Sequence, residues 1–528
     1  MPKCTIDGKE IEVPAGTTVL EAALGHGIDI QYFCWHPDLG IDGNCRTCMV
    51  EIEKMPRVQI ACNTMVTEGM VVRTNTDKAH AAQRSALELL LINHPIDCPV
   101  CDQAGECYLQ DNYMRYGLHN SEVEIEEKVK KRKVQDLGPI MLDAERCVLC
   151  TRCVRFEEQV TGTNSLEFRN RGDHKEIGTY KGQPITHDYA GNLADLCPVG
   201  ALLSHDFRFK MRVWFLKSHE SICPGCSTGC NIDVDERDGE AQRFRPRRNP
   251  DVNKSWMCDI GRNSYKEIGL TSRVTGARQK ATARWDGVSV SSALDAVAAQ
   301  LKEAGSASAF LATPQGSNED LFAFKALADA AGGRLDFRVG DPQAKLKVRT
   351  DNVLLREDKN PNTQGCLDQG LGRSGVAEIL AACGRGDVKA LVLQGPELLR
   401  VPEAVLALSK VPFIAVMATH EGPELDRAHV VLPAALWAEG EGTFTNYDRR
   451  VQRFRRAVPA PGEALALWEL ASGILARLGK PLGASSPRDI FGLLAASAGY
   501  SGLDYKAIGP MGRKIEEAGI SPAPEARA

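Results

Sequence analysis

The sequence lacks any long run of apolar residues. Hydrophobic residues make up 43% of the 528-residue chain, yet no uninterrupted stretch approaches the ~18 residues of a membrane-spanning helix. The start, Met1-Pro-Lys-Cys-Thr-Ile-Asp-Gly, also lacks the apolar segment of a signal peptide. We therefore expect a soluble chain that associates with a membrane only through partner proteins.

Signals for nucleotide and nucleic-acid binding are also missing. No phosphate-binding loop of the form G-x4-G-K-S/T occurs, and a net charge of −5 over this length indicates no nucleic-acid partner. Residues 370–375 match G-x-G-x-x-G, but residues 362–369 before them do not resemble a strand, so we interpret this match as chance. The basic run Arg243–Arg248 is predicted to lie in a solvated loop.

Cysteine, in contrast, is abundant and unevenly placed. Sixteen of the 18 cysteines lie in residues 1–258, and only two lie in the remaining 270 residues. Disulfide frameworks are typical of small exported domains, whereas this is a large chain without an export signal. We therefore expect reduced thiolates that bind metal, in a first half of small metal-bound modules, followed by a second half with an ordinary core.

Fifteen cysteines and one histidine fall into four groups of four, each with the spacing of an iron–sulfur site. In chain order the groups are Cys34, Cys45, Cys48 and Cys62; His94, Cys98, Cys101 and Cys107; Cys147, Cys150, Cys153 and Cys197; and Cys223, Cys226, Cys230 and Cys258. Close Cys-x2-Cys pairs let one loop hold two irons. We predict one [2Fe–2S] cluster at the first group and one [4Fe–4S] cluster at each of the others.

The first group follows a pattern of strand, turn, strand and helix in residues 1–33. Asp7-Gly8 indicates a hairpin turn, and Thr18 with Glu21 forms a capping box before a helix. This order resembles a ferredoxin β-grasp domain, which favours a [2Fe–2S] cluster. A structural zinc site with four thiolates is the alternative.

The other three groups each depart from a simple four-cysteine motif. His94 takes the place of a thiolate in the second group, where zinc is again an alternative. The third group has the Cys-x2-Cys-x2-Cys run of bacterial ferredoxins, but Glu157 stands where a further Cys-Pro would follow, and Cys197-Pro198 supplies it later. The fourth group has the spacing C-x2-C-x3-C-x27-C, which resembles the site near the N-terminus of molybdopterin oxidoreductases.

From about residue 290 the pattern changes to alternating strands and helices, typical of an open parallel sheet. The predicted strands of this region are Ala307–Ala312, Arg334–Val339, Lys389–Gln394, Phe413–Met417 and His429–Leu432. Its predicted helices include Asn318–Ala331 and Val401–Leu408, and a further helix is predicted in the first half, at Asp77–Asn93. Residues 121–136 are charge-dense and are interpreted as a solvated connector, and the Pro- and Ala-rich tail after about Ile520 is expected to be mobile.

The chain exceeds the size of a single core, so we predict a multidomain protein that combines α+β modules with an α/β domain. The predicted parts are a [2Fe–2S] β-grasp ferredoxin domain (1–77), a His- and Cys-ligated [4Fe–4S] domain (78–120), a linker with a ferredoxin-like [4Fe–4S] domain (121–215), a molybdopterin-oxidoreductase-type [4Fe–4S] domain (216–272), and a degenerate molybdopterin-oxidoreductase-like α/β domain with its tail (273–528).

The order of the sites resembles the family of iron–sulfur G subunits of bacterial NADH:quinone oxidoreductases, the respiratory complex I. The motifs that carry this resemblance lie in residues 43–48, 94–107, 147–153 and 195–202, with weaker similarity in residues 428–433 and 441–452. The family retains the molybdopterin-oxidoreductase fold in the second half without its cofactor. The resemblance therefore implies no molybdopterin and no FMN in this chain.

The resemblance also implies a function. A partner flavoprotein oxidises NADH, electrons pass the first, third and second centres in that order, and they leave toward the quinone-reducing arm, with the fourth centre off the route. It implies a peripheral place on the cytoplasmic side of the inner (plasma) membrane. The chain itself is expected to relay electrons without a catalytic residue or substrate site of its own.

Two departures and several alternatives remain. The second half is shorter than in many members of the family, and Ile260 stands where molybdenum enzymes carry a lysine after the last cysteine of the fourth group. Cys366 and Cys383 are expected to be buried apolar residues. The alternatives are a molybdenum or tungsten formate dehydrogenase, an iron-only hydrogenase, a diaphorase subunit of a hydrogenase, and a zinc-bound scaffold. The iron-only hydrogenase needs further cysteines after the fourth group, and this chain has too few.

Overall fold

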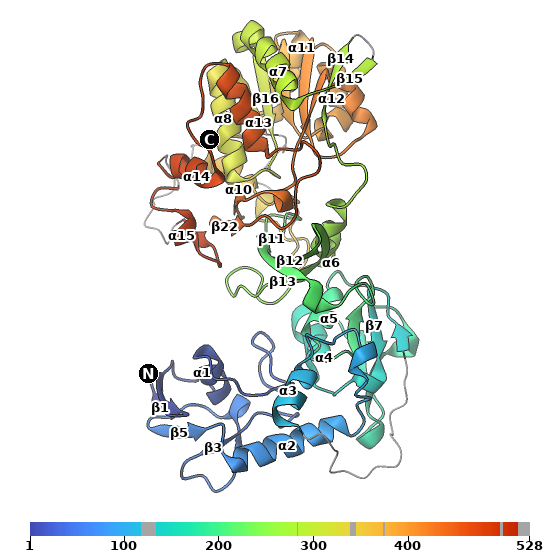
Figure 1. Cartoon of the computed structure of the whole chain (residues 1–528), viewed down its shortest axis with the longest axis vertical. Coiled ribbons are helices and arrows are strands. Elements are labelled where there is room, and N and C mark those ends of the chain that lie inside the picture. Colours follow the sequence, from blue (N-terminus) through green and yellow to red (C-terminus); the bar gives the residue numbers. More distant parts are fainter. Residues whose placement is uncertain (118–133, 282–283, 338–344, 373–374, 497–499, 516–528) are drawn as a thin grey trace. The chain divides into compact units, whose positions relative to one another are not determined.

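The structure is a computed structural model in which two compact units are recognised, Met1–Leu216 and Lys217–Ala528. The described residues are 1–117, 134–281, 284–337, 345–372, 375–496 and 500–515. Each unit is described by itself (Figure 1). Most of the charge-dense segment 121–136 and the tail after residue 520 lie outside the described residues, and the five finer domain limits stay predictions.

The first unit begins with a β-grasp sheet in the strand order β2-β1-β5-β3-β4, in which β1 and β5 are parallel. Its elements are β1 (Lys3–Ile6), β2 (Lys9–Glu12), α1 (Val19–Gly25), β3 (Met49–Ile52), β4 (Gln59–Ile60) and β5 (Met70–Arg73). Asp7 and Gly8 both have positive φ, 49° and 84°, as a two-residue hairpin turn requires. The Thr18–Glu21 capping box is present at the start of α1.

The rest of the first unit consists of short elements that carry the second and third groups. They are α2 (Asp77–Leu91), α3 (Tyr108–Tyr116), β6 (Val134–Asp136), β7 (Ile140–Asp143), α4 (Arg152–Phe156), β8 (Leu166–Arg169), β9 (Glu176–Thr179), α5 (Gly191–Leu196) and β10 (Leu202–Ser204). Helix α2 confirms the predicted helix. The strands form a three-stranded sheet β10-β7-β6 and a hairpin β8-β9.

The second unit begins with a three-stranded antiparallel sheet that carries the fourth group. Its elements are β11 (Lys217–Ile222), β12 (Asn231–Arg237), β13 (Glu240–Pro246) and α6 (Asp259–Asn263). The expected loop at Arg243–Arg248 is wrong, because most of that run lies in β13. Arg243 and Arg245 both donate from Nε to Oδ2 of the buried Asp235, at 2.7 and 3.0 Å. The basic run therefore forms side-chain hydrogen bonds from β13 to the neighbouring strand β12.

The second half contains the predicted open sheet, in the order β15-β14-β20-β19-β18-β16-β17. Its strands are β14 (Ala277–Ala281), β15 (Arg284–Val288), β16 (Ser308–Ala312), β17 (Arg334–Phe337), β18 (Ala390–Gln394), β19 (Phe413–Ala418) and β20 (Val430–Pro433). The five predicted strands are confirmed and are mutually parallel. The antiparallel hairpin β14–β15, which extends one edge of the sheet, was not predicted from the sequence.

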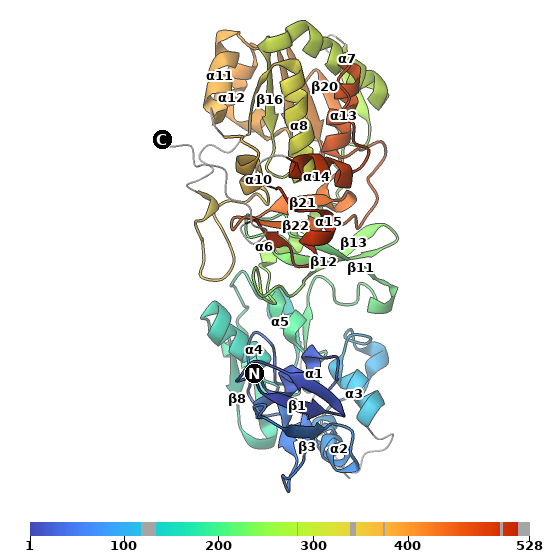
Figure 2. The ribbon, with the colours of Figure 1, turned by 90° about the vertical axis from the view of Figure 1, so that its left-hand side faces the viewer.

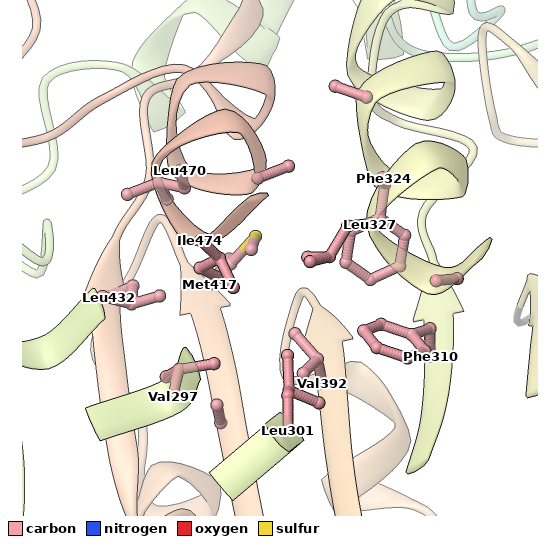
Figure 3. Packing of buried hydrophobic residues seen from close by; sticks show 14 of the residues in the cluster. Val297, Leu301, Phe310, Phe324, Leu327, Val392, Met417, Leu432, Leu470 and Ile474 are labelled. Atoms are coloured by element: carbon pink, nitrogen blue, oxygen red, sulfur yellow. The ribbon is translucent and has the colours of Figure 1, made fainter. Parts of the chain in front are cut away.

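Helices cover both faces of this sheet (Figure 2). One face packs against α7 (Val290–Ala304), α8 (Asn318–Ala331) and α13 (Leu467–Arg477), and the other against α11 (Gly375–Arg385) and α12 (Pro402–Leu408). Side chains along each strand alternate between the two cores: Phe310 and Val392 face α8, whereas Leu311 and Leu391 face α11 and α12. Figure 3 shows Phe310, Phe324 and Leu327 packed together on the α8 side.

A smaller sheet and short helices complete the second unit. They are β21 (Gly442–Thr445), β22 (Arg450–Phe454), β23 (Arg513–Lys514), α10 (Thr363–Asp368), α14 (Pro487–Ala495) and α15 (Tyr505–Ile508). Helix α10 lies just before the G-x-G-x-x-G match, whose residues 373 and 374 are outside the described part. A dinucleotide fingerprint needs a strand there, so the interpretation as chance is supported.

Candidate metal centres

The first group gathers four thiols in the loop between α1 and β3 and in the turn after β4. Cys34, Cys48 and Cys62 are each 1% exposed. Hydrogen bonds from Cys45 and Cys62 lower the pKa of the Cys34 thiol, whereas the bond to Cys34 raises the pKa of Cys62. Each of the four thiols thus has another thiol of the group as a neighbour. The structure therefore brings the whole predicted group together.

The second group lines a single cavity of about 40 Å³ between α2 and α3. His94, Cys98, Cys101 and Cys107 all face it, together with apolar side chains such as Leu109. Burial raises the pKa of Cys107 to about 12 and also raises that of Cys101. Thiols in such an apolar place ionise only when a cation replaces their protons, which is what a metal cluster does.

The third group lines a cavity of about 20 Å³ with apolar walls. Cys147, Cys150, Cys153 and Cys197 all face it. The residues on either side of Cys150 have left-handed backbones, with φ of 52° at Leu149 and 67° at Thr151. Such conformations are strained for residues other than glycine and concentrate at ligand sites. The resulting tight curl places three thiols of one short loop around one cavity.

The fourth group lies in the second unit, between the end of β11 and the start of α6. Burial raises the pKa values of Cys223, Cys230 and Cys258, and the charges of neighbouring thiolates within the group add to this shift. A Cβ atom at Gly261 would lie 2.7 Å from Sγ of Cys223. Glycine is therefore required at this position, because the backbone approaches the sulfur too closely for any side chain.

Each of the 16 predicted residues thus lies with the other members of its group. Among the described residues, no three His, Cys, Asp or Glu side chains converge on a point suited to one metal ion. The case for these sites therefore rests on the shared cavities, the chemistry of the donors and the close glycine. The remaining cysteines, Cys4, Cys366 and Cys383, are buried, as expected for Cys366 and Cys383.

The three sites of the first unit are joined to one another through the third group. Asn44, in the first-site loop, donates from Nδ2 to the carbonyl of Leu149 in the third-site loop, at 3.2 Å. The amide of Tyr108, next to Cys107, donates to the carbonyl of Pro198, at 3.0 Å. A Cβ at Gly200 would lie 2.5 Å from Sγ of Cys101. The third group is therefore in direct contact with the surroundings of both others.

Three buried arginines at these junctions were not predicted from the sequence: Arg146, Arg152 and Arg155, which are 2%, 3% and 8% exposed. All three lie within or beside the Cys147–Cys153 run. Long cationic side chains are rarely fully buried, so their position inside a cysteine motif was the signal available. Which loops they reach could be read only from the structure.

Five family models match parts of this chain. Residues 3–77 match the family model of a 2Fe-2S iron-sulfur cluster binding domain, and residues 83–122 that of the NADH-ubiquinone oxidoreductase-G iron-sulfur binding region. Residues 138–203 match the ferredoxin-like domain of NADH-quinone oxidoreductase subunit 3. Residues 216–269 match the molybdopterin oxidoreductase Fe4S4 domain, and residues 362–477 match molybdopterin oxidoreductase. These matches confirm the predicted fold class.

Curated relatives are similar to about half of this chain. The G subunit of NADH-quinone oxidoreductase from Streptomyces coelicolor is 43% identical over 273 residues, which are 51% of this chain and 32% of the relative. The same subunit of Rickettsia bellii is 43% identical over 268 residues, 50% of this chain and 39% of the relative. The chain thus matches about a third of the length of these relatives. The predicted resemblance to the G subunits is confirmed over about half of this chain.

A mitochondrial relative and a solved structure are also similar. The NADH dehydrogenase [ubiquinone] iron-sulfur protein 1 of Solanum tuberosum is 44% identical over 263 residues, 49% of this chain and 35% of the relative. A crystal structure of NAD+-reducing [NiFe]-hydrogenase in the H2-reduced state is 30% identical, covers 40% of this chain and 91% of that one, and has a TM-score of 0.37.

Proposed function

We propose that this chain is the iron–sulfur electron-relay subunit of an NADH:quinone oxidoreductase. The observation that carries this proposal is the set of three donor groups in the first unit, joined through the third. The similarity of about half of this chain to the G subunits of such enzymes supports it. A relay needs fixed, closely spaced sites more than it needs a substrate pocket, and this unit supplies such sites.

We assign a [2Fe–2S] cluster to the first group and a [4Fe–4S] cluster to each of the other three. When bound, such clusters accept and donate single electrons. The chain contributes the thiolates and the His94 imidazole, apolar walls that exclude water, and backbone that approaches the sulfurs closely at Gly200 and Gly261. Burial and nearby dipoles then set each potential.

The contacts support a relay order of first, third and second group. Backbone and side-chain hydrogen bonds join the third-site loops to Asn44 on one side and to Tyr108 on the other. The third group is therefore suited to the middle position. The fourth group belongs to the separate second unit, and we assign it a structural role.

The partners follow from the same proposal. A flavin-bearing subunit that oxidises NADH delivers electrons to the first group, and an iron–sulfur subunit of the quinone arm receives them from the second. Among the described residues, no helix is long and apolar enough to span a membrane. We propose that the chain is peripheral, on the cytoplasmic side of the plasma membrane, and is held there by these partners.

Anaerobic reconstitution of the full chain with iron and sulfide tests the assignment. One binuclear and three tetranuclear clusters predict about 14 irons per chain. Dithionite should bleach the visible absorption, whereas NADH alone should not, because the proposal places the flavin on a partner. Stoichiometric zinc in place of iron, or bleaching by NADH without any flavoprotein, would contradict the proposal.

The alternative of a molybdopterin enzyme is not favoured, although residues 216–269 and 362–477 match molybdopterin oxidoreductase family models. The side chain at the position of the lysine found in molybdenum enzymes is Ile260, which is 54% exposed. Elemental analysis of the natively purified protein separates the two candidates. We expect neither molybdenum nor tungsten, and stoichiometric metal with bound pterin would favour a formate dehydrogenase.

A further inference from the structure

Arg152 lies at the junction of all three sites in the first unit. Its Nη2 donates to the carbonyl of Trp35, next to Cys34, at 2.8 Å. Its Nη1 donates to the carbonyl of Leu196, next to Cys197, at 3.2 Å. Its guanidinium carbon also lies 5.5 Å from the ring centre of Tyr108, next to Cys107. One side chain therefore contacts the neighbours of one cysteine from each group.

The charge of Arg152 has no carboxylate to balance it among the described residues. Its hydrogen bonds go to the two carbonyls, and its guanidinium group lies over the rings of Tyr32 and Tyr108. Its Nε is buried without a hydrogen-bond partner. A buried, unbalanced cation is costly, by several kcal/mol or more. Such a charge is retained where a bound group supplies the opposite charge.

Arg146, next to Cys147 of the third group, provides the contrast. Its Nη2 lies 2.7 Å from Oδ2 of Asp97, and its Nη1 lies 3.5 Å from Oδ2 of Asp143. This arginine faces the second group, in which His94 replaces one thiolate and so removes one negative charge. Arg146, whose partner Asp97 lies among the residues of the second group, is thus balanced by carboxylates, whereas Arg152, inside a four-thiolate group, is not.

Electrostatics gives the sign of the effect. A cluster with four thiolates is anionic, and reduction adds a further negative charge. A fixed cation in a low-dielectric surrounding stabilises the more negative form.

We propose that Arg152 is a positioning residue that holds the three cluster sites in register and raises the midpoint potential of the third centre. This inference rests on the proposed relay function. The guanidinium supplies two separable properties, a charge beside the third group and a fork of donors to two carbonyls that lie in different sites. Lysine keeps only the charge, and glutamine keeps hydrogen bonding without the charge.

The test uses the full chain, reconstituted anaerobically, as wild type, Arg152→Gln and Arg152→Lys. Arg171→Gln is the control, because it removes an exposed arginine from the same module. Iron content is measured first, and redox titration followed by electron paramagnetic resonance then gives each midpoint potential. Iron absent from the wild type would contradict the proposed function itself, whereas the remaining outcomes concern Arg152 alone.

If Arg152→Gln keeps its full iron content, we expect the oxidised-to-reduced ratio of the third centre to rise at least tenfold at a fixed potential. For a one-electron couple, this corresponds to a midpoint potential about 59 mV lower. Arg152→Lys should keep the potential, but its magnetic coupling between centres should change as the sites lose register. An unchanged potential in Arg152→Gln with full iron overturns the inference. If Arg152→Gln loses iron, the result for Arg152→Lys tests the inference. A wild-type potential in Arg152→Lys supports the inference, whereas loss of iron in both variants shows that Arg152 has only a structural role.

Discussion

His94 is the only imidazole among the 16 predicted ligands, and its effect can be isolated. Replacing a neutral imidazole by a thiolate makes the second centre more negative, so adding an electron costs more. We predict that His94→Cys retains its iron and lowers the midpoint potential of that centre, by on the order of 100 mV by analogy with histidine-ligated centres. Redox titration of the reconstituted chain measures the shift.

His174→Cys is the matched control, because it adds a thiol at an exposed histidine of the same unit. It should leave all potentials unchanged. An unchanged or higher potential in His94→Cys would show that His94 is not a ligand.

Glu319 gives a residue-scale prediction in the second unit. Its carboxylate is buried and accepts hydrogen bonds from Thr443 N, Thr443 Oγ1 and Tyr505 OH. Burial nevertheless raises the pKa of Glu319 from 4.5 to about 7. Because the pKa of this acid is raised on folding, its contribution to the free energy of unfolding is fully present below pH 4.5 and is lost as the pH rises through about 7. The loss amounts to about 3 kcal/mol.

Glu319→Gln removes this titration while the amide can still bond to both hydroxyls. Denaturant unfolding of the second unit at pH 5 and pH 8 should therefore differ less in the variant than in the wild type. The comparison cancels other titrating groups, such as Asp320 and Asp368. An identical pH dependence in both proteins would contradict the assignment of a raised pKa to Glu319.

At the scale of elements, the first turn of α6 closes the fourth site. Cys258 caps this helix, and the amide of Gly261 donates to Sγ of Cys258 at 3.3 Å. We predict that Gly261→Ala loses about four irons per chain, because its Cβ would lie 2.7 Å from Sγ of Cys223. Iron analysis after reconstitution measures the loss.

Gly225→Ala is the matched control. Its Cβ would lie 3.5 Å from the same sulfur, which is ordinary contact. This variant should keep the iron content of the wild type. Equal losses in both variants would mean that the fold, and not the close approach at Gly261, decides the result.

Elements were predictable from sequence where the signal is local. The Asp7-Gly8 turn, the capping box at Thr18, helix α8 and the five parallel strands all follow from neighbouring residues. The membership of each cysteine group is a matter of spacing, and the structure gathers every group. Whether these residues bind clusters stays a prediction until iron is measured.

The failures share one cause, which is dependence on distant partners. The Arg243–Arg248 run resembles a loop until Asp235 is placed beside it on the neighbouring strand. The hairpin β14–β15 joins the parallel sheet only through β20, about 150 residues later in the sequence. The reach of Arg152 into the first site crosses 117 residues. No local pattern encodes such pairings.

At the scale of the whole molecule, the two units differ in what stabilises them. The second unit has apolar cores on both faces of a seven-stranded sheet. The modules of the first unit that follow the β-grasp domain are short elements around cysteine loops, so cluster binding supplies much of their folding free energy. We predict that iron chelation lowers the unfolding temperature of the first unit far more than that of the second.

Anaerobic calorimetry before and after chelation measures both unfolding transitions. The transition of the second unit is identified as the one whose pH dependence changes in Glu319→Gln. Cys258→Ser separates the contribution of the fourth site. Equal shifts of the two transitions would show that the first unit folds without its metal.

The contacts of the Cys197–Gly200 loop also constrain the order in which the chain can mature during synthesis. The first site draws all its cysteines from within 62 residues and can close while translation continues. The second has its four donors by residue 107, yet the carbonyl of Pro198 and the backbone of Gly200 that pack against it emerge about 90 residues later. On the ribosome, the face of the second site at Cys101 and Tyr108 therefore stays uncovered until Pro198 and Gly200 have been synthesised, which is an interval in which this part of the nascent chain is exposed to oxidation or to the wrong metal.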